Sequence, residues 1–279
     1  MKNAVVFGAC SAIAQATAKI WASENANFVL VDQNQDHLQI VADDLKARGA
    51  QKVTTIAANL THLDNHSKLI QQIQTILSTS HSLPRRSRVP LEAGLPTTYL
   101  FSYGTLGNQR KGQEDFADAF NELQINFISV VSLLTEIINT HQANTTNEAT
   151  SSSSGNPLQQ EQAILAVISS VAGDRGRQSN YIYGTAKGAL TIWLQGLRNR
   201  LTKEDANIHV LTIKPGFVDT PMTKDFKKGL LWVKPERIAK DIDHAIRKKK
   251  DTIYTPWFWR YIMLIIRHIP ETIFKKMSL

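Results

Sequence analysis

Short apolar runs recur along this chain, and longer stretches of helical periodicity separate most of them. The runs have the length of strands and cover residues 4–7, 28–31, 53–57, 99–101, 164–168, 209–213 and 252–254. Between them, residues 15–23 and 116–138 carry apolar side chains at the spacing of a helix face. The pattern predicts strands and helices that alternate from the N-terminus.

Such alternation predicts a mainly parallel sheet with helices on both faces. Parallel neighbours need a crossover connection, and a helix supplies it. Several runs are apolar without interruption, as expected of strands that are covered on both sides. We therefore expect an α/β fold with a doubly wound, seven-stranded sheet as a single domain at 1–254, followed by a C-terminal amphipathic tail at 255–279.

Two segments lack this periodicity. Residues 141–162 are polar and low in complexity, and we interpret them as a flexible surface insertion before the strand at 164–168. A domain boundary is the alternative, but the strand pattern resumes beyond it. Residues 81–96 contain Pro84, Pro90, Gly94 and Pro96 and predict a second loop extension.

Composition indicates a globular protein with a sizeable core. Of the 279 residues, 42% are hydrophobic and 20% are charged, which excludes the class of disordered chains. The lone Cys10 excludes an internal disulfide and favours a reducing compartment. The first residues lack the apolar region of a signal peptide, so we expect a cytoplasmic protein.

The formal net charge of +8 is concentrated towards the C-terminus. This placement suits an anionic surface, although each small cluster also suits a solvated face. We expect no nucleic-acid partner. The basic residues concerned are Lys227, Lys228, Arg247, Lys248, Lys249, Lys250, Arg267, Lys275 and Lys276.

Tyr183 and Lys187 stand four residues apart in a helical stretch, and Ser170 precedes them. Side chains at this spacing share a helix face, so the ammonium can lie beside the phenol and lower its pKa. A phenol with such a neighbour can donate a proton at neutral pH. Because the same pair more often decorates a solvated face, the interpretation depends on the rest of the chain.

A candidate nucleotide site follows the first strand. The turn from Gly8 to Ala14 consists mostly of small residues and opens a helix, whose N-terminus favours a pyrophosphate. Asp32 ends the second strand, where its carboxylate can accept hydrogen bonds from both ribose hydroxyls and repel a 2′-phosphate. The pattern favours NAD(H), with NADP(H) as the alternative, although a tight turn and a capping acid can also be purely structural.

Taken together, these residues resemble the short-chain dehydrogenase/reductase family. In family order the chain has the glycine-poor turn at Gly8, the acid at Asp32, and Ser170 thirteen residues before Tyr183. Lys187 follows, and Pro215-Gly216 with Thr220 comes after the sixth strand. The resemblance covers roughly residues 2–254. It implies a Rossmann fold and NAD(P)-dependent hydride transfer between a nicotinamide and a ketone or secondary alcohol.

The resemblance also implies roles for individual residues. Tyr183 would be the general acid in reduction and the base in oxidation, Lys187 would lower its pKa and hold the nicotinamide ribose, and Ser170 would polarise the carbonyl. Asn126 resembles the helix asparagine that holds a water, and the insertion at 141–162 accounts for its large separation from Tyr183. Besides Tyr183 and Lys187, the implied cofactor-binding residues are Gly8, Ser11, Ala12, Ile13, Asp32, Asn59, Leu60, Gly104, Pro215, Gly216, Val218 and Thr220.

Two segments depart from the family pattern. Residues 101–104 read Phe-Ser-Tyr-Gly where the family often shows Asn-Asn-Ala-Gly, and Ala12 and Ala14 replace the later glycines of the turn. Neither departure removes a catalytic group, so we expect an effect on cofactor geometry rather than on activity.

Within the family, one subgroup is the most similar. The run at 167–190, the YGTLG stretch at 103–107 and the tail resemble reductases of polyprenyl-phosphate-linked keto sugars, typified by decaprenylphosphoryl-2-keto-erythro-pentose reductase. The resemblance implies a lipid-linked substrate, although loops set the substrate in such folds.

The tail combines aromatic residues, an aliphatic block and two arginines. Its apolar core of about ten residues is too short to span a bilayer, which needs about twenty. On a helix, Arg260 and Arg267 lie on one side, which suits a position in a membrane interface. We expect peripheral membrane contact through 257–276, at the inner face of the membrane. Packing on the protein's own surface, as a lid or a homo-oligomer contact, is the alternative.

Two further patterns are weaker. Residues 222–233 place Phe226 and Trp232 among lysines where the family has its substrate loop, which suits a lipid phosphate but also any mobile lid. His62 and His66 are spaced for a metal, but no carboxylate or cysteine pattern completes the site, so we expect no metal.

Three functions follow from these patterns. The first is reduction or oxidation of a carbonyl substrate, with a lipid-linked keto sugar as its specific form. The second keeps this chemistry for a small soluble carbonyl and uses the tail as an oligomer contact. The third is a catalytically silent, nucleotide-binding scaffold, favoured by the altered turn and opposed by the intact group of Asn126, Ser170, Tyr183 and Lys187.

Overall fold

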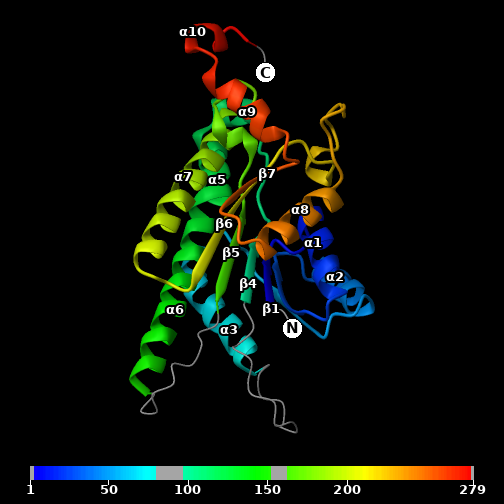
Figure 1. The fold of residues 1–279 in the computed structure, drawn as a ribbon. Coiled ribbons are helices and arrows are strands. Elements are labelled where there is room, and N and C mark those ends of the chain that lie inside the picture. The colour runs from blue at the N-terminus through cyan, green and yellow to red at the C-terminus, as the bar shows by residue number, and fades with distance from the viewer. Residues whose placement is uncertain (1–2, 80–96, 152–161, 278–279) are drawn as a thin grey trace.

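Parallel strands form a seven-stranded sheet at the centre of the computed structural model, which describes residues 3–79, 97–151 and 162–277 (Figure 1). The strand order is β3-β2-β1-β4-β5-β6-β7, and all adjacent strands run parallel. Each predicted strand is present, and the predicted fold class is confirmed. The strands are β1 (Asn3–Phe7), β2 (Asn27–Asp32), β3 (Lys52–Ala57), β4 (Thr97–Phe101), β5 (Ala163–Ile168), β6 (Ile208–Pro215) and β7 (Thr252–Thr255).

Helices cover both faces of the sheet (Figure 1). Helices α1 (Ala12–Ala22), α2 (Gln35–Ala47) and α8 (Pro235–Arg247) pack on one face. The other face is covered by α3 (His66–Thr79), α6 (Ser129–Ser151) and α7 (Tyr181–Lys203). The remaining helices are α4 (Gln109–Glu114), α5 (Phe116–Leu123), α9 (Trp259–His268) and α10 (Glu271–Phe274), with short turns η1 (Leu63–Asn65), η3 (Val171–Asp174) and η4 (Pro221–Thr223).

Two apolar cores result, one on each side of the sheet. In β1, Val5 and Phe7 belong to the core under α3, α6 and α7, whereas Ala4 and Val6 belong to the core under α1, α2 and α8. Alternate residues of a strand point to opposite faces. Burial on both faces therefore explains why this strand is apolar without interruption.

A π-helical turn interrupts the longest helical stretch. Helix α5 continues through η2 (Gln124–Ile128) into α6, and Asn126 lies inside this turn with no exposed surface. Such π turns widen a helix locally and are frequent at functional sites. Among the described residues, one helix is long and apolar enough to cross a bilayer, judged by length and composition alone. It is the stretch Phe116–Ala143. Its Leu133 and Leu134 are buried in the core, as in a core helix of a soluble protein.

The predicted flexible insertion at 141–162 is wrong in its first part, because α6 extends to Ser151. The chain has no glycine or proline between Ser129 and Ser151. The helix can therefore extend from its buried first turns with only a small unfavourable helix propensity at each added residue. Residues 152–161 of that segment and the whole predicted loop at 81–96 fall outside the described residues.

Candidate active site

The predicted site residues gather at the carboxyl edge of the sheet. The strand order reverses between β1 and β4, which makes this the switch point where open α/β sheets bind their ligands. Gly8, Ser11, Ala12 and Ile13 follow β1, Asp32 ends β2, Asn59 and Leu60 follow β3, and Gly104 follows β4. Ser170 follows β5, Pro215, Gly216, Val218 and Thr220 end or follow β6, Asn126 lies in η2, and Tyr183 and Lys187 lie in α7.

The turn after β1 packs closely against the segment after β4. Gly8 has φ +76°, and a Cβ at this position would lie 2.6 Å from the backbone nitrogen of Tyr103, so glycine is required. Ser11 caps α1 by accepting a hydrogen bond from the Ala14 N–H at 3.2 Å, and its Oγ shares a 2.7 Å hydrogen bond with Ser102 Oγ. Residues 101–104, which depart from the family pattern, thus help to shape the turn. The N-terminus of α1 suits a phosphate group.

Asp32 is fixed between β2 and the same turn. Its Oδ2 accepts a hydrogen bond from the Cys10 N–H at 3.0 Å, and its Oδ1 accepts one from the Gln33 N–H at 2.8 Å. The carboxylate keeps further lone pairs for the hydroxyls of a ribose. Burial, helped by the charge of Asp32, raises the pKa of the Cys10 thiol to about 12, so this thiol is a protonated structural group.

The segment after β3 is held by a chain of hydrogen bonds. The carbonyl oxygen of Leu60 accepts from Ser129 Oγ at 2.6 Å and lies 2.9 Å from His66 Nε2, while His66 Nδ1 lies 2.9 Å from Ser132 Oγ. Both ring nitrogens of His66 therefore have protein partners, and burial lowers its pKa. His66 is a structural residue. In the described residues, no three or more histidine, cysteine or acidic side chains gather as a metal site would require.

Ser170, Tyr183 and Lys187 come together from two elements. Ser170 precedes η3 and accepts a hydrogen bond from the Ala172 N–H at 3.1 Å, and its hydroxyl lies close enough to Tyr183 to lower the pKa of that phenol. Lys187 Nζ lies 5.8 Å from the centroid of the Tyr183 ring and donates to the Ile168 carbonyl at 3.2 Å. The arrangement brings the hydroxyl groups of Ser170 and Tyr183 close to the ammonium of Lys187.

The expected lowering of the Tyr183 pKa by Lys187 is not found. Burial raises the pKa of Tyr183 to about 12, against the opposing effect of the Ser170 hydrogen bond. Burial also lowers the pKa of Lys187 to about 8. Desolvation disfavours both charged forms, so at neutral pH the phenol is protonated while the lysine is largely charged. The phenol is therefore in the form that can donate a proton.

Asn126 is oriented by hydrogen bonds from its amide nitrogen. Nδ2 donates to the Thr105 carbonyl at 3.0 Å and to Glu122 Oε1 at 2.7 Å, whereas Oδ1 is buried without a hydrogen-bond partner in the described part of the chain. A Cβ at Gly104 would lie 2.5 Å from Asn126 Oδ1 and 3.4 Å from Lys187 Nζ, so these two atoms face the same place. A buried acceptor of this kind suits a water or ligand hydroxyl.

Glu122 is a site residue that the sequence reasoning missed. It is 5% exposed and bonds to Asn126 inside the site. The available signal was its position four residues before Asn126, which places both on one helix face.

The segment after β6 contacts the tail directly. Val218 pairs with Val233, and Thr220 caps η4. Gly216 lies so close to the Trp259 ring that a Cβ would overlap it. The side chain of Trp259 therefore rests on the segment that, by family resemblance, holds the nicotinamide.

Helix α9 has a packed face and an exposed face. Trp259 and Met263 are buried against Val171, the neighbour of Ser170, whereas Tyr261, Leu264 and Ile265 are exposed. Figure 1 shows α9 and α10 at the top of the molecule, beyond the end of the sheet. Packing on the protein's own surface therefore accounts for one face of α9 and leaves the opposite apolar face open.

Arg175, at the end of η3, ties the tail to the site. Its Nη1 donates at 2.6 Å to the carbonyls of both Ile266 and Ile269, and its guanidinium lies 3.8 Å from the centroid of the Phe274 ring. Sequence reasoning missed this contact, because nothing in the residue pattern links position 175 to the tail.

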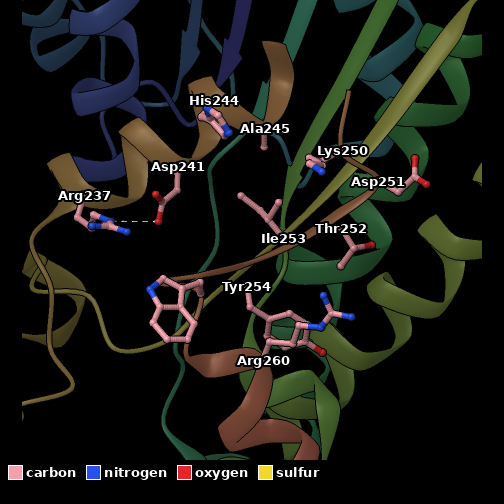
Figure 2. A pocket seen from close by; sticks show the side chains of 11 residues that line it. Arg237, Asp241, His244, Ala245, Lys250, Asp251, Thr252, Ile253, Tyr254 and Arg260 are labelled. Atoms are coloured by element: carbon pink, nitrogen blue, oxygen red, sulfur yellow. Dashed lines mark hydrogen bonds and ion pairs between the residues drawn. The ribbon is translucent and has the colours of Figure 1, made fainter. Parts of the chain in front are cut away.

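A hollow of about 630 Å³ lies apart from these residues, along β7 and α8 (Figure 2). Figure 2 shows Arg237 paired with Asp241 on its rim, and Asp241 also accepts a hydrogen bond from Thr255. None of the predicted site residues lines this hollow. The candidate active site is therefore the strand-end cluster.

The cluster fits a dinucleotide on structural grounds. The Gly8 turn, the oriented Asp32 carboxylate and the buried acceptor Asn126 Oδ1 supply sites for phosphate, ribose and a ligand hydroxyl or water.

Comparison with known proteins identifies similar chains. A protein-family model described as short chain dehydrogenase matches residues 2–230. An uncharacterized oxidoreductase of Mycobacterium tuberculosis is 30% identical over 273 residues, covering 98% of this chain and 96% of that protein.

Two solved structures share the fold. A short-chain dehydrogenase from Sphingobium yanoikuyae in complex with NADPH matches with a TM-score of 0.71 at 14% identity, covering 100% of this chain and 97% of that one. An alcohol dehydrogenase from the archaeon Thermococcus sibiricus complexed with 5-hydroxy-NADP has a TM-score of 0.66 at 15% identity, covering 91% and 95%.

Replacing Arg175 should loosen the tail. Arg175→Met removes hydrogen bonds from a charged donor, each worth about 1.5–3 kcal/mol, so hydrogen exchange of the amides of α9 and α10 should accelerate about tenfold or more. The control Glu271→Gln removes only the ion pair of Arg175 with a 77% exposed partner and should change little. Equal exchange in Arg175→Met and the unaltered protein would contradict the assigned role.

Proposed function

Because the chain belongs to the short-chain dehydrogenase family, we propose that it transfers a hydride between a nicotinamide cofactor and a ketone or secondary alcohol. The chain is an oxidoreductase of that family. The observation that carries the proposed reaction is that Ser170, Tyr183 and the charged Lys187 come together at the carboxyl edge of the sheet.

The three side chains have distinct tasks in reduction. Tyr183 donates its proton to the carbonyl oxygen, and Ser170 stabilises the negative charge that develops there by a second hydrogen bond. Lys187 is largely protonated at neutral pH and supplies a positive charge beside the Tyr183 ring. In oxidation the same groups act in reverse.

The residues that would hold the cofactor lie along the strand ends. The Gly8 turn and the N-terminus of α1 would bind the pyrophosphate, Asp32 a ribose, and the 215–220 segment the nicotinamide. A bound nicotinamide accepts or supplies the hydride at its C4 atom.

Replacing Tyr183 tests the reaction. Tyr183→Phe removes the proton donor and should lower kcat with a ketone substrate and NADH by at least about a hundredfold, while NADH binding, followed by fluorescence, persists. Tyr181→Phe is the matched control, because Tyr181 is 43% exposed on the same helix and should retain activity.

Retained turnover in Tyr183→Phe would contradict the assignment. NADH binding without any oxidation by the unaltered protein, across a panel of soluble and lipid-linked ketones, would favour the silent scaffold.

For the cofactor, we infer a preference for NAD(H). The support is the Asp32 carboxylate, together with the absence of arginine and lysine from residues 8–14 and 32–35. The two structures compared above contain NADPH and 5-hydroxy-NADP and point the other way. At 14–15% identity they share the fold but not necessarily the residue at the ribose.

Asp32→Asn tests this preference. It keeps the size and one acceptor oxygen but removes the charge that repels a 2′-phosphate, so the ratio of kcat/KM for NADH over NADPH should fall about tenfold, or about 1.4 kcal/mol. Asp36→Asn removes an exposed acid four residues away and should leave the ratio unchanged. A higher kcat/KM for NADPH than for NADH in the unaltered protein would refute the inference.

For the substrate, we propose a polyprenyl-phosphate-linked keto sugar, reduced at the cytoplasmic face of a membrane. The subgroup resemblance supports it, and so does the exposure of Met222 in η4, and of Phe226 and Leu230 beside lysines in the segment that follows. The open face of α9 adds Tyr261, Leu264 and Ile265, next to Arg260 and Arg267. Apolar side chains among cations suit an anionic bilayer surface. A small soluble carbonyl, with this face as an oligomer contact, is the alternative.

Membrane binding is best tested without deleting the tail, because a deletion would also remove the packing of Trp259 against Gly216. The double variant Leu264→Ser, Ile265→Ser should bind anionic vesicles at least about tenfold more weakly in co-sedimentation, since each side chain gains about 1.5–3 kcal/mol on burial. The control Ile40→Ser, Ile192→Ser alters side chains that are 68% and 71% exposed on α2 and α7. Failure of the unaltered protein to pellet with anionic vesicles would refute the proposed contact.

A further inference from the structure

Glu122 occupies a closely fitted place inside the site. Its Oε2 accepts a hydrogen bond from Thr105 Oγ1 at 2.7 Å, and its Oε1 accepts one from Asn126 Nδ2 at 2.7 Å. Gly107 has φ +62°, and a Cβ there would lie 2.5 Å from Glu122 Oε2. The backbone of the segment after β4 therefore packs so closely against the carboxylate that any side chain at position 107 would clash with it.

Glu122 and Lys187 are opposite charges buried in one place. Glu122 is 5% exposed and Lys187 is 3% exposed. Each acts electrostatically on the other: Lys187 opposes the burial that raises the pKa of Glu122, and Glu122 opposes the burial that lowers the pKa of Lys187. Buried charges are rarely retained unless they are paired.

The other titratable groups around Lys187 are engaged or exposed. Asp174 of η3 binds Lys214 at 2.6 Å and the Tyr254 hydroxyl at 2.7 Å, and the Tyr103 hydroxyl bonds to Ser129. Glu114 of α4, Asp118 of α5 and Asp115 between the two helices are exposed. Tyr183 and Glu122 are the titratable groups that face Lys187 among the described residues.

Glu122 also determines which way the Asn126 amide points. An ionised carboxylate accepts hydrogen bonds but donates none, so it selects the amide nitrogen of Asn126 as its partner. The amide oxygen is thereby turned towards the place that it shares with Lys187 Nζ.

We propose that Glu122 is a positioning residue of this site: it fixes Asn126 with Oδ1 towards Lys187, and its buried carboxylate is the counter-charge of that ammonium. Its effect on turnover rests on the proposed function, whereas the charge pairing does not. Its carboxylate is held by Thr105 and Asn126, so its action on the site passes through Asn126 and Lys187.

Glu122→Gln separates charge from shape. Glutamine can accept the bond from Asn126 and donate to Thr105 Oγ1, but it carries no charge. Because Glu122 raises the pKa of both Lys187 and Tyr183, its neutralisation lowers both. Reduction needs both groups protonated, so the alkaline limb of the kcat/KM profile should move down by about one pH unit. At pH 9 the additional loss is about tenfold.

Two variants control for structure. Glu122→Asp keeps the charge and should hold the alkaline limb near that of the unaltered protein. Asp118→Asn removes an exposed acid one turn earlier on α5 and should not move it. An alkaline limb that Glu122→Gln leaves in place, or that Asp118→Asn moves equally, would overturn the proposal.

A second measurement is independent of turnover. In protein with ¹³C-labelled lysine, the Cε resonance of Lys187, assigned by its loss in Lys187→Met, reports the protonation of this ammonium. Its midpoint should fall in Glu122→Gln, and in the unaltered protein the resonance should also respond when Glu122 titrates at lower pH. An unmoved midpoint or no such response overturns the pairing, even if Glu122→Gln does not fold. A moved midpoint in a protein that turns over no ketone supports the pairing and refutes the proposed function instead.

Discussion

The burial of charge at one edge of a parallel sheet is the constraint on which the site depends. Because all seven strands run the same way, every strand delivers its following residues to the same edge. Lys187 and Glu122 are placed there out of water, and neither charge is tolerable alone. Both charges lie among hydrogen-bonding groups: Thr105 and Asn126 donate to Glu122, and the Ile168 carbonyl accepts from Lys187.

The same edge is held together by contacts between segments far apart in the chain. Gly8 packs on Tyr103, Ser11 bonds to Ser102, and the Cys10 amide bonds to Asp32. The π turn then brings Asn126 into line with Lys187. These contacts explain why the departures at 101–104 are compatible with the fold: the replacement side chains have partners of their own, such as Ser129 for the Tyr103 hydroxyl.

The tail is part of the site's framework as well as a surface. Trp259 rests on Gly216, Met263 packs near Val171, and Arg175 holds the end of α9. Binding at the outer face of α9 would therefore act on residues that adjoin Ser170 and the 215–220 segment.

The sequence alone determined the seven strands, their parallel arrangement, and the residue types of the candidate site, including Tyr183, Lys187 and the turn at Gly8. These follow from local signals: apolar runs of strand length, a glycine after β1, and a tyrosine and lysine that share a helix face. Tertiary structure decided the rest. The pKa of Tyr183 is raised rather than lowered because burial outweighs the effect of Ser170, and the hydrogen bond from Asn126 to Glu122 turns Asn126 Oδ1 towards Lys187. The buried and exposed faces of α9, and the hydrogen bonds of Arg175 to the tail, depend on where distant segments meet. Residue spacing carries no information about such long-range packing or about the desolvation that accompanies it.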